Sequence, residues 1–211
     1  MSIQCLFYAI ETKGWLALYK RDPVPRDKLY TDFCTVVHEF HVAILPSTLV
    51  ILVVSWPFID AVIRPLEFAR LCEYIFDALL FLAVYNVVFY WAHRGMHLPG
   101  VYEHVHKKHH QNTSPMSAIH TDHATVHEVV FGVVVVHTVS MGIMCSVWYL
   151  AGGMPVQVAW LKLVFDLAQS ISSHSGYSFV PGERHHSLHH TRARSNYAMP
   201  WVDWLFGTYE T

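Results

Sequence analysis

The chain alternates between long apolar stretches and short polar segments rich in histidine. Each long apolar stretch is close to the roughly 20 residues that a helix needs to cross the core of a bilayer. The pattern therefore predicts four membrane-spanning helices, the first interrupted by Pro46 and Pro57. These helices are expected near residues 41–63, 73–91, 126–150 and 154–173.

Composition supports a membrane protein. Hydrophobic residues make up 53% of the chain and charged residues 14%, well below the roughly 25% charged residues of soluble domains. The formal charge of −2 gives no reason to expect a nucleic-acid partner. Four scattered cysteines lack the CxxC spacing of a thiolate metal site.

The segment before the first span has its own pattern. Residues 3–19 place apolar side chains at helical spacing and end in aromatic residues. We expect an amphipathic helix on the membrane surface, with an ordinary surface helix as the alternative. The chain is then a single domain, 1–211, with an interfacial segment at 1–35, the four spans within 36–173, and a C-terminal cap at 174–211.

Three histidine-rich segments carry the candidate chemistry: HRGMH at 93–97, HKKHH at 106–110 and HSLHH at 186–190. In each, the outer histidines are four residues apart, and the last two segments add a histidine at i+3. On a helix these positions share one face, and imidazole is a common ligand of transition metals. Eight imidazoles exceed the needs of one ion, so the pattern predicts a two-metal site. The predicted ligands are His93, His97, His106, His109, His110, His186, His189 and His190.

Other interpretations of these segments remain open. A single HxxxH pair occurs by chance, and a histidine-rich tract can be a loose metal-binding tail. A metal transporter would place ionisable ligands within several spans, whereas these segments flank the spans. A structural metal site in a receptor or scaffold would need a closed coordination shell.

The order of spans and histidine segments predicts a topology. The first two segments follow the second span and the third follows the fourth, so all three lie on one face of the membrane. The histidine side and the N-terminal segment carry eleven of the 14 lysines and arginines, which places that side and both termini in the cytosol. These eleven are Lys13, Lys20, Arg21, Arg26, Lys28, Arg94, Lys107, Lys108, Arg184, Arg192 and Arg194.

The order HRGMH, HKKHH, HSLHH resembles the fatty acid hydroxylase/sterol desaturase superfamily of membrane-bound histidine-box di-iron oxygenases. Neighbouring residues strengthen the resemblance, which covers roughly residues 70–208. They are Tyr102-Glu103 before the second box, Gln111 to Pro115 after it, His174 to Tyr177 before the third, and the closing segment from Asn196 to Thr208.

The resemblance implies an all-α, four-helix transmembrane bundle with a cytosolic, histidine-rich helical cap. It implies two iron ions that use O₂ and externally supplied electrons to hydroxylate an unactivated C–H bond of a lipid. The lipid, a sterol, fatty-acyl or terpenoid compound, would enter from the membrane. A desaturase on the same scaffold is the nearest alternative. The electron donor would be a b-type cytochrome or a ferredoxin with its reductase, and zinc could replace iron in purified protein.

Two further histidines are candidate ligands. His174 is the expected ninth ligand, because it lies at the cytosolic end of the fourth span, shortly before the third box. His123 is the expected tenth, from the His-Pro-x-Glu that sterol-oxidising members carry after the second box. The proline is absent here, and His120 and His127 are additional. The expected location is the endoplasmic reticulum of a eukaryote or the inner membrane of a bacterium.

Overall fold

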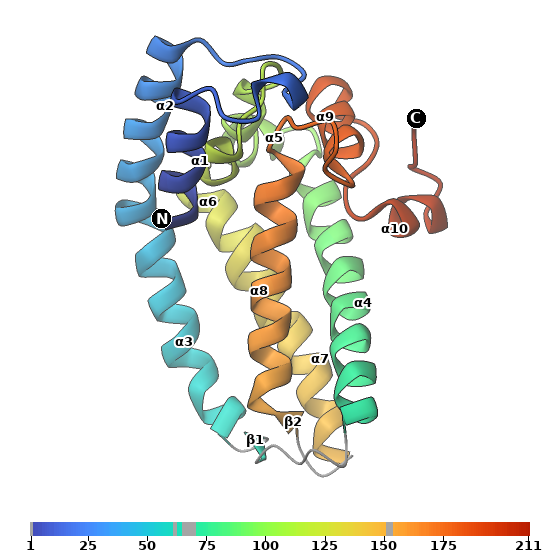
Figure 1. The fold of residues 1–211 in the computed structure, drawn as a ribbon. Coiled ribbons are helices and arrows are strands. Elements are labelled where there is room, and N and C mark those ends of the chain that lie inside the picture. The colour runs from blue at the N-terminus through green and yellow to red at the C-terminus, as the bar shows by residue number, and fades with distance from the viewer. Residues whose placement is uncertain (1, 61–62, 65–70, 151–153) are drawn as a thin grey trace.

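Long helices form the body of the protein and short helices form a cap at one end of them (Figure 1). The computed structural model describes residues 2–60, 63–64, 71–150 and 154–211. Within these ranges the regular structure is helical, apart from the parallel pair of two-residue strands β1 (Ile63–Arg64) and β2 (Met154–Pro155). This strand pair lies at the end opposite the cap (Figure 1).

The body consists of four helical columns, two of them with a π-helical segment. These are α2 (Arg26–Glu39), η2 (Phe40–Ile44) and α3 (Leu45–Asp60); α4 (Leu71–Met96); α6 (Val126–Glu128), η6 (Val129–Val135) and α7 (Val136–Leu150); and α8 (Val156–Ser173). The cap contains α1 (Ser2–Thr12), η1 (Ala17–Tyr19), α5 (Tyr102–Val105), η4 (His109–Gln111), η5 (Ala118–Asp122), α9 (Glu183–Arg192) and α10 (Pro200–Leu205).

Three of the columns contain helices long and apolar enough to cross a membrane: Arg26–Val50, Cys72–Met96 and Val126–Leu150. The largely helical, membrane type of fold is therefore confirmed. The expected fourth span, α8, is an 18-residue helix but is not among these three candidates. It carries Lys162 and Asp166 near its middle, which lower its hydropathy.

The first column differs from the prediction, because it begins at Arg26 rather than near residue 41. Its π-helical segment, η2, comes just before Pro46. A proline inside a helix supplies no N–H and its ring collides with the carbonyl four residues earlier. An added residue in the preceding turn accommodates that conflict, so the helix continues where the sequence indicated an interruption.

The amphipathic helix expected over residues 3–19 is also shorter in the structure. The helix α1 ends at Thr12, and Gly14 follows it with a φ of +70°. Glycine adopts this left-handed conformation without the steric penalty of a Cβ atom. The chain turns there, and Trp15, Leu16 and Leu18 lie exposed on the cap.

A buried apolar cluster joins three columns in the half of the body that is far from the cap. Tyr74 and Phe81 of α4 pack with Met144 and Trp148 of α7 and with Val158 of α8. The rings of Phe81 and Trp148 meet edge to face with their centroids 5.3 Å apart. This packing holds the columns together and leaves their other ends to support the cap.

Candidate metal centre

Nine of the ten candidate ligands gather where the cap meets the long helices. His93 lies on the last turn of α4, His97 directly follows that helix, and His174 directly follows α8. The remaining six come from the second box, around α5 and η4, and from the third box on α9. Segments more than 90 residues apart in the sequence thus meet in one place, as the 3.1 Å between His97 Nε2 and His189 Nε2 shows.

The nine side chains form two groups, within each of which the candidate ligand atoms lie within 4.8 Å of one another. The five-histidine group consists of His93, His97, His106, His110 and His189. The four-histidine group consists of His109, His174, His186 and His190. Seven of the nine residues are buried, and His97 and His186 are partly exposed.

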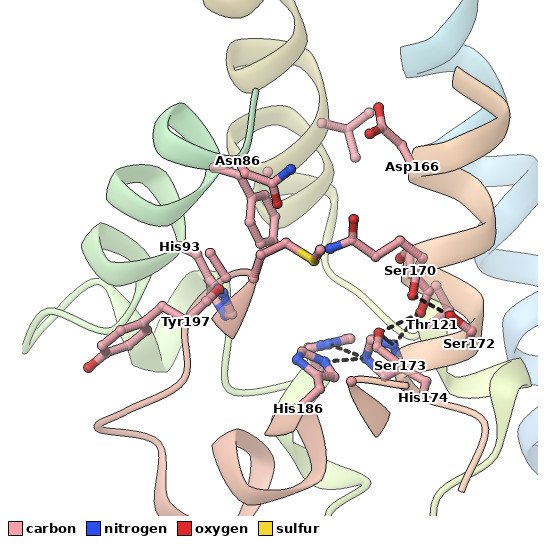
Figure 2. Close-up of a pocket in the computed structure, with 18 of the residues that line it drawn as sticks. Asn86, His93, Thr121, Asp166, Ser170, Ser172, Ser173, His174, His186 and Tyr197 are labelled. Carbon is pink, nitrogen blue, oxygen red and sulfur yellow. Dashed lines mark hydrogen bonds between the residues drawn. The ribbon is translucent and has the colours of Figure 1, made fainter. Parts of the chain in front are cut away.

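Within each group the Nε2 atoms face one another. His93 and His106 are 2.8 Å apart at these atoms, and His106 and His110 are 3.1 Å apart. In the four-histidine group, His174 Nε2 lies 3.0 Å from that of His109 and 2.9 Å from that of His186. Figure 2 shows His174 and His186 with their ring nitrogens turned toward each other.

In several of the rings, including His93, His174 and His189, the opposite nitrogen binds a backbone carbonyl oxygen outside the groups. His189 Nδ1 donates to the carbonyl oxygen of Ser195 at 2.7 Å, and His174 Nδ1 donates to that of Ser170 at 2.8 Å. His93 Nδ1 donates to the carbonyl oxygen of Tyr197. A proton held on Nδ1 leaves the Nε2 lone pair free to face the centre.

Burial also keeps these rings neutral. Loss of hydration lowers the pKa of His97 to about 2 and the pKa of His110 and His174 to about 4. Burial, reinforced by neighbouring imidazoles, lowers the pKa values of the other cap histidines as well, namely His106, His109, His186, His189 and His190. A neutral imidazole is the form that binds a metal ion.

The donor set fits two metal ions. Five imidazoles in one group and four in the other bring their candidate ligand atoms within 4.8 Å of one another. Without a cation such an arrangement would be repulsive, and side-chain tautomers alone satisfy at most a pair of facing nitrogens. Imidazole nitrogen suits iron and zinc alike, so the geometry fits a two-metal site without selecting the element.

The second box reaches this geometry in an unexpected way. Its histidines were predicted to share one face of an α-helix, but α5 ends at Val105 and His106 caps it. His109 and His110 lie on the 3₁₀ helix η4 and belong to different groups. The third box lies on the continuous helix α9, and there too the neighbours His189 and His190 belong to different groups.

The structure does not bring His123 into either group. Its Nδ1 lies 3.2 Å from Glu39 Oε2, and its Nε2 lies 3.3 Å from Gln111 Oε1. Its backbone carbonyl accepts a hydrogen bond from His109 Nδ1 at 3.3 Å. The residue is therefore next to the centre, with its side chain directed to a carboxylate.

Glu128 supports the centre from the start of the third column. It is buried, and its Oε1 lies 2.9 Å from His106 Nδ1 and 3.8 Å from His109 Nδ1. One carboxylate thus contacts a histidine of each group. The backbone carbonyl groups of Ser195 and Tyr197 likewise orient histidines of the centre, because they accept hydrogen bonds from His189 and His93. A backbone acceptor cannot be recognised from the sequence.

A cavity of about 670 Å³ adjoins the centre between α4, η6 and α8. His93, His106, His109, His174 and His186 line one end of it. Apolar side chains such as Phe89, Met96 and Val133 line its walls. Figure 2 shows His93, His174 and His186 at one end and Asn86 and Asp166 at the other. A long apolar molecule can therefore place one of its carbons beside the histidines.

Known proteins resemble the chain in sequence. The family model described as fatty acid hydroxylase matches residues 78–208. A very-long-chain aldehyde decarbonylase, GL1-11, of Oryza sativa subsp. indica is 26% identical over 94% of this chain and 76% of its own length. Methylsterol monooxygenase 2-2 of Arabidopsis thaliana is 25% identical over 96% of this chain and 78% of its own length. Methylsterol monooxygenase erg25B of Aspergillus fumigatus is 30% identical over 64% of this chain and 48% of its own length.

No solved structure matches the chain significantly. The family match covers more than half of the sequence and includes all three histidine boxes, the supporting Glu128, and both walls of the cavity on α4 and α8. The chain belongs to the fatty acid hydroxylase family, within the fatty acid hydroxylase/sterol desaturase superfamily.

Proposed function

We propose that the protein is a membrane-embedded di-iron oxygenase that hydroxylates an unactivated C–H bond of a lipid. The observation that carries the proposal is the pair of histidine groups at the end of an apolar cavity. The similarity to methylsterol monooxygenases supports an oxidoreductase that acts on a sterol, fatty-acyl or terpenoid lipid. Very-long-chain aldehyde decarbonylases among the relatives make a long acyl chain an equally suitable substrate.

The nine grouped histidines are the proposed ligands of two iron ions. When bound, such a pair of ions would bind O₂ and, with electrons supplied from outside, reduce it to the oxidant that attacks a C–H bond. The chain supplies the neutral Nε2 donors and orients rings such as His93, His174 and His189 through their Nδ1 hydrogen bonds. The apolar cavity wall orients the lipid and excludes water from the reacting carbon.

The arrangement in the membrane is part of the proposal. A single domain, 1–211, places four helical columns in the bilayer, with α8 held among the others rather than facing lipid along its whole length. The histidine-bearing cap and both termini face the cytosol, following the excess of lysine and arginine on that side. The lipid enters from the membrane, and electrons come from a b-type cytochrome or a ferredoxin with its reductase.

Two alternatives differ in what they require of the centre. A desaturase would use the same ligands and differ only in how the substrate carbons sit beside them. A metal transporter would need ligands along a path through the membrane. The grouped histidines lie at one end of the columns, which favours an enzyme over a transporter.

The test is to measure metal content and lipid products together. Protein purified from cells grown with iron should hold two metal ions per chain, and O₂ with an electron donor should convert a cellular lipid into a product heavier by one oxygen atom. Product lighter by two hydrogens would indicate the desaturase. One metal ion per chain in active, fully loaded protein would contradict the two-metal proposal.

A further inference from the structure

Charged and polar groups lie inside the body of the protein at the end of the cavity that is far from the histidines. Lys162 and Asp166 of α8 form an ion pair, and their side chains are only 3% and 9% exposed. The Lys162 ammonium also lies 3.5 Å from the ring centroid of Tyr85 on α4. Ionisable groups at such depth in a membrane protein are costly and usually mark a site that binds or moves something.

The Asp166 carboxylate has unused capacity to accept hydrogen bonds. Its Oδ2 pairs with Lys162, while no residue in the described ranges donates a hydrogen bond to its Oδ1. His137 Nε2 is 3.7 Å from Oδ2, beyond hydrogen-bonding distance. The same ring donates its Nδ1 proton to the carbonyl oxygen of Val133 at 2.8 Å. A buried acceptor without a donor costs the desolvation free energy of that group, and a ligand that donates a hydrogen bond can offset this cost.

Asp166 is also a wall residue of the cavity, together with Tyr85, Asn86 and Gln169. Figure 2 shows Asn86 on α4 and Asp166 on α8 on opposite sides of the end away from His174 and His186. Asn86 uses one amide N–H on the Leu82 carbonyl oxygen at 2.8 Å, and its amide carries a second N–H. A donor and an acceptor thus flank this end.

We propose that this end of the cavity binds a hydroxyl group of the lipid substrate, with the hydroxyl donating to Asp166. The inference rests on the proposed function, because it treats the cavity as the substrate site. A neutral hydroxyl fits better than a charged group, since Lys162 and Asp166 already neutralise each other and a further charge would be buried without a partner.

The helices fix how far this hydroxyl lies from the reacting carbon. Asp166 precedes His174 by eight residues along α8, which corresponds to about 12 Å at the helical rise. Asn86 precedes His93 by seven residues along α4, which gives about 10 Å by the same measure. The two walls agree, so the substrate class is a lipid whose hydroxyl lies about 10–12 Å from the carbon that is oxidised. A hydroxyl adjacent to that carbon would not reach Asp166.

The test compares two probes that differ in one donor, 1-dodecanol and its methyl ether. Both carry an ether or alcohol oxygen, but only the alcohol can donate to Asp166. We would measure their binding to the metal-loaded full chain in nanodiscs, without an electron donor, so that no turnover occurs. The wild type should prefer the alcohol by about tenfold or more, as expected for a hydrogen bond to a charged group.

The main variant replaces both charges, Lys162→Met with Asp166→Leu, because apolar replacement of a buried ion pair usually preserves folding. It should lose the preference for the alcohol while keeping its affinity for the ether and its metal content. Ser146→Ala, on the exposed face of α7, is the matched control and should keep the preference. A purely structural ion pair would lower the binding of both probes equally, and that result would overturn the proposal.

A second measurement needs no variant. A dodecanol with a photoreactive diazirine beside its hydroxyl should label peptides that contain residues 81–89 and 162–169. Labelling of the histidine segments instead would place the hydroxyl at the metal end and overturn the proposal. Because neither measurement requires turnover, absence of oxidised product or of a second metal would count against the proposed function alone.

Discussion

The contact between Glu128 and His106 leads to a quantitative prediction about the five-histidine group. His106 is central to that group, since its Nε2 lies 2.8 Å from that of His93 and 3.1 Å from that of His110. Glu128 Oε1 is 2.9 Å from His106 Nδ1 but 3.8 Å from His109 Nδ1. Glu128→Leu should therefore free His106 to rotate while leaving the four-histidine group nearly intact.

Loss of a group that orients a ligand typically weakens metal binding by about 10–100-fold, or about 1.4–2.8 kcal/mol. We expect that loss for one of the two metal ions and a much smaller change for the other. Glu128→Gln keeps an oxygen acceptor, so its metal affinity should lie between that of Glu128→Leu and that of the wild type. The assay is a competition with a metal chelator, in which the two ions should leave in one step from the wild type and in two separated steps from Glu128→Leu.

A matched control is available on the same cap. Glu103 forms an exposed ion pair with Lys107 at 2.6 Å, and exposed pairs contribute little. Glu103→Gln should release metal as the wild type does. If Glu128→Leu lost both ions together, or neither more readily than Glu103→Gln, the assignment of Glu128 to the five-histidine group would be refuted.

The remaining predictions concern the ligands, the pH and the topology. His109→Ala or His189→Ala should abolish product and reduce the number of metal ions per chain without preventing insertion into the membrane. His137→Ala should instead lower the stability of helix packing by roughly 1–2 kcal/mol and keep both ions. Equal metal loss in all three variants would refute the assignment of His109 and His189 as ligands. The free energy of unfolding of the metal-free protein should fall as the pH drops from about 6.5 toward about 4, where His110 and His174 protonate in the folded state. The reason is that these histidines bind protons at a higher pH in the unfolded chain than in the folded protein. Urea denaturation at pH 7 and pH 5 would measure this difference, and equal free energies of unfolding at the two pH values would contradict it. Cysteines at Glu103 and Leu150 in intact vesicles should be labelled from opposite sides, and labelling of both from one side would reject the proposed topology.

The sequence revealed the centre more fully than it revealed the helices. Histidine spacing and family resemblance predicted nine candidate ligands that the structure brings together, because the first box lies at the end of α4 and the third on α9. The division of the boxes between two groups was not predicted. In the second and third boxes alike, the outer histidines share one group and the histidine at i+3 belongs to the other, which the expectation of one shared helix face did not anticipate.

The bounds of the long helices were predicted well where the apolar pattern is uninterrupted. They were predicted poorly where a proline or a glycine lies within the pattern. The third span was expected near residues 126–150, and the structure has a candidate span at Val126–Leu150. Pro46 indicated a break in the first helix, but the π-helical segment η2 before it accommodates the proline and the helix continues. Gly14 had the opposite effect, because it ended α1 within a pattern that otherwise continued.

The polarity of α8 connects the fold to the function. In the described residues α8 is the column without a candidate span, and Lys162 and Asp166 lower its hydropathy. Yet α8 packs against α4, where Lys162 lies over the Tyr85 ring and Val158 joins the apolar cluster. A helix that faces neighbours on one side can carry charge at a cost that its partners reduce. The residues that make α8 a weak membrane span therefore include Asp166, which gives the cavity a polar end opposite the candidate metal centre.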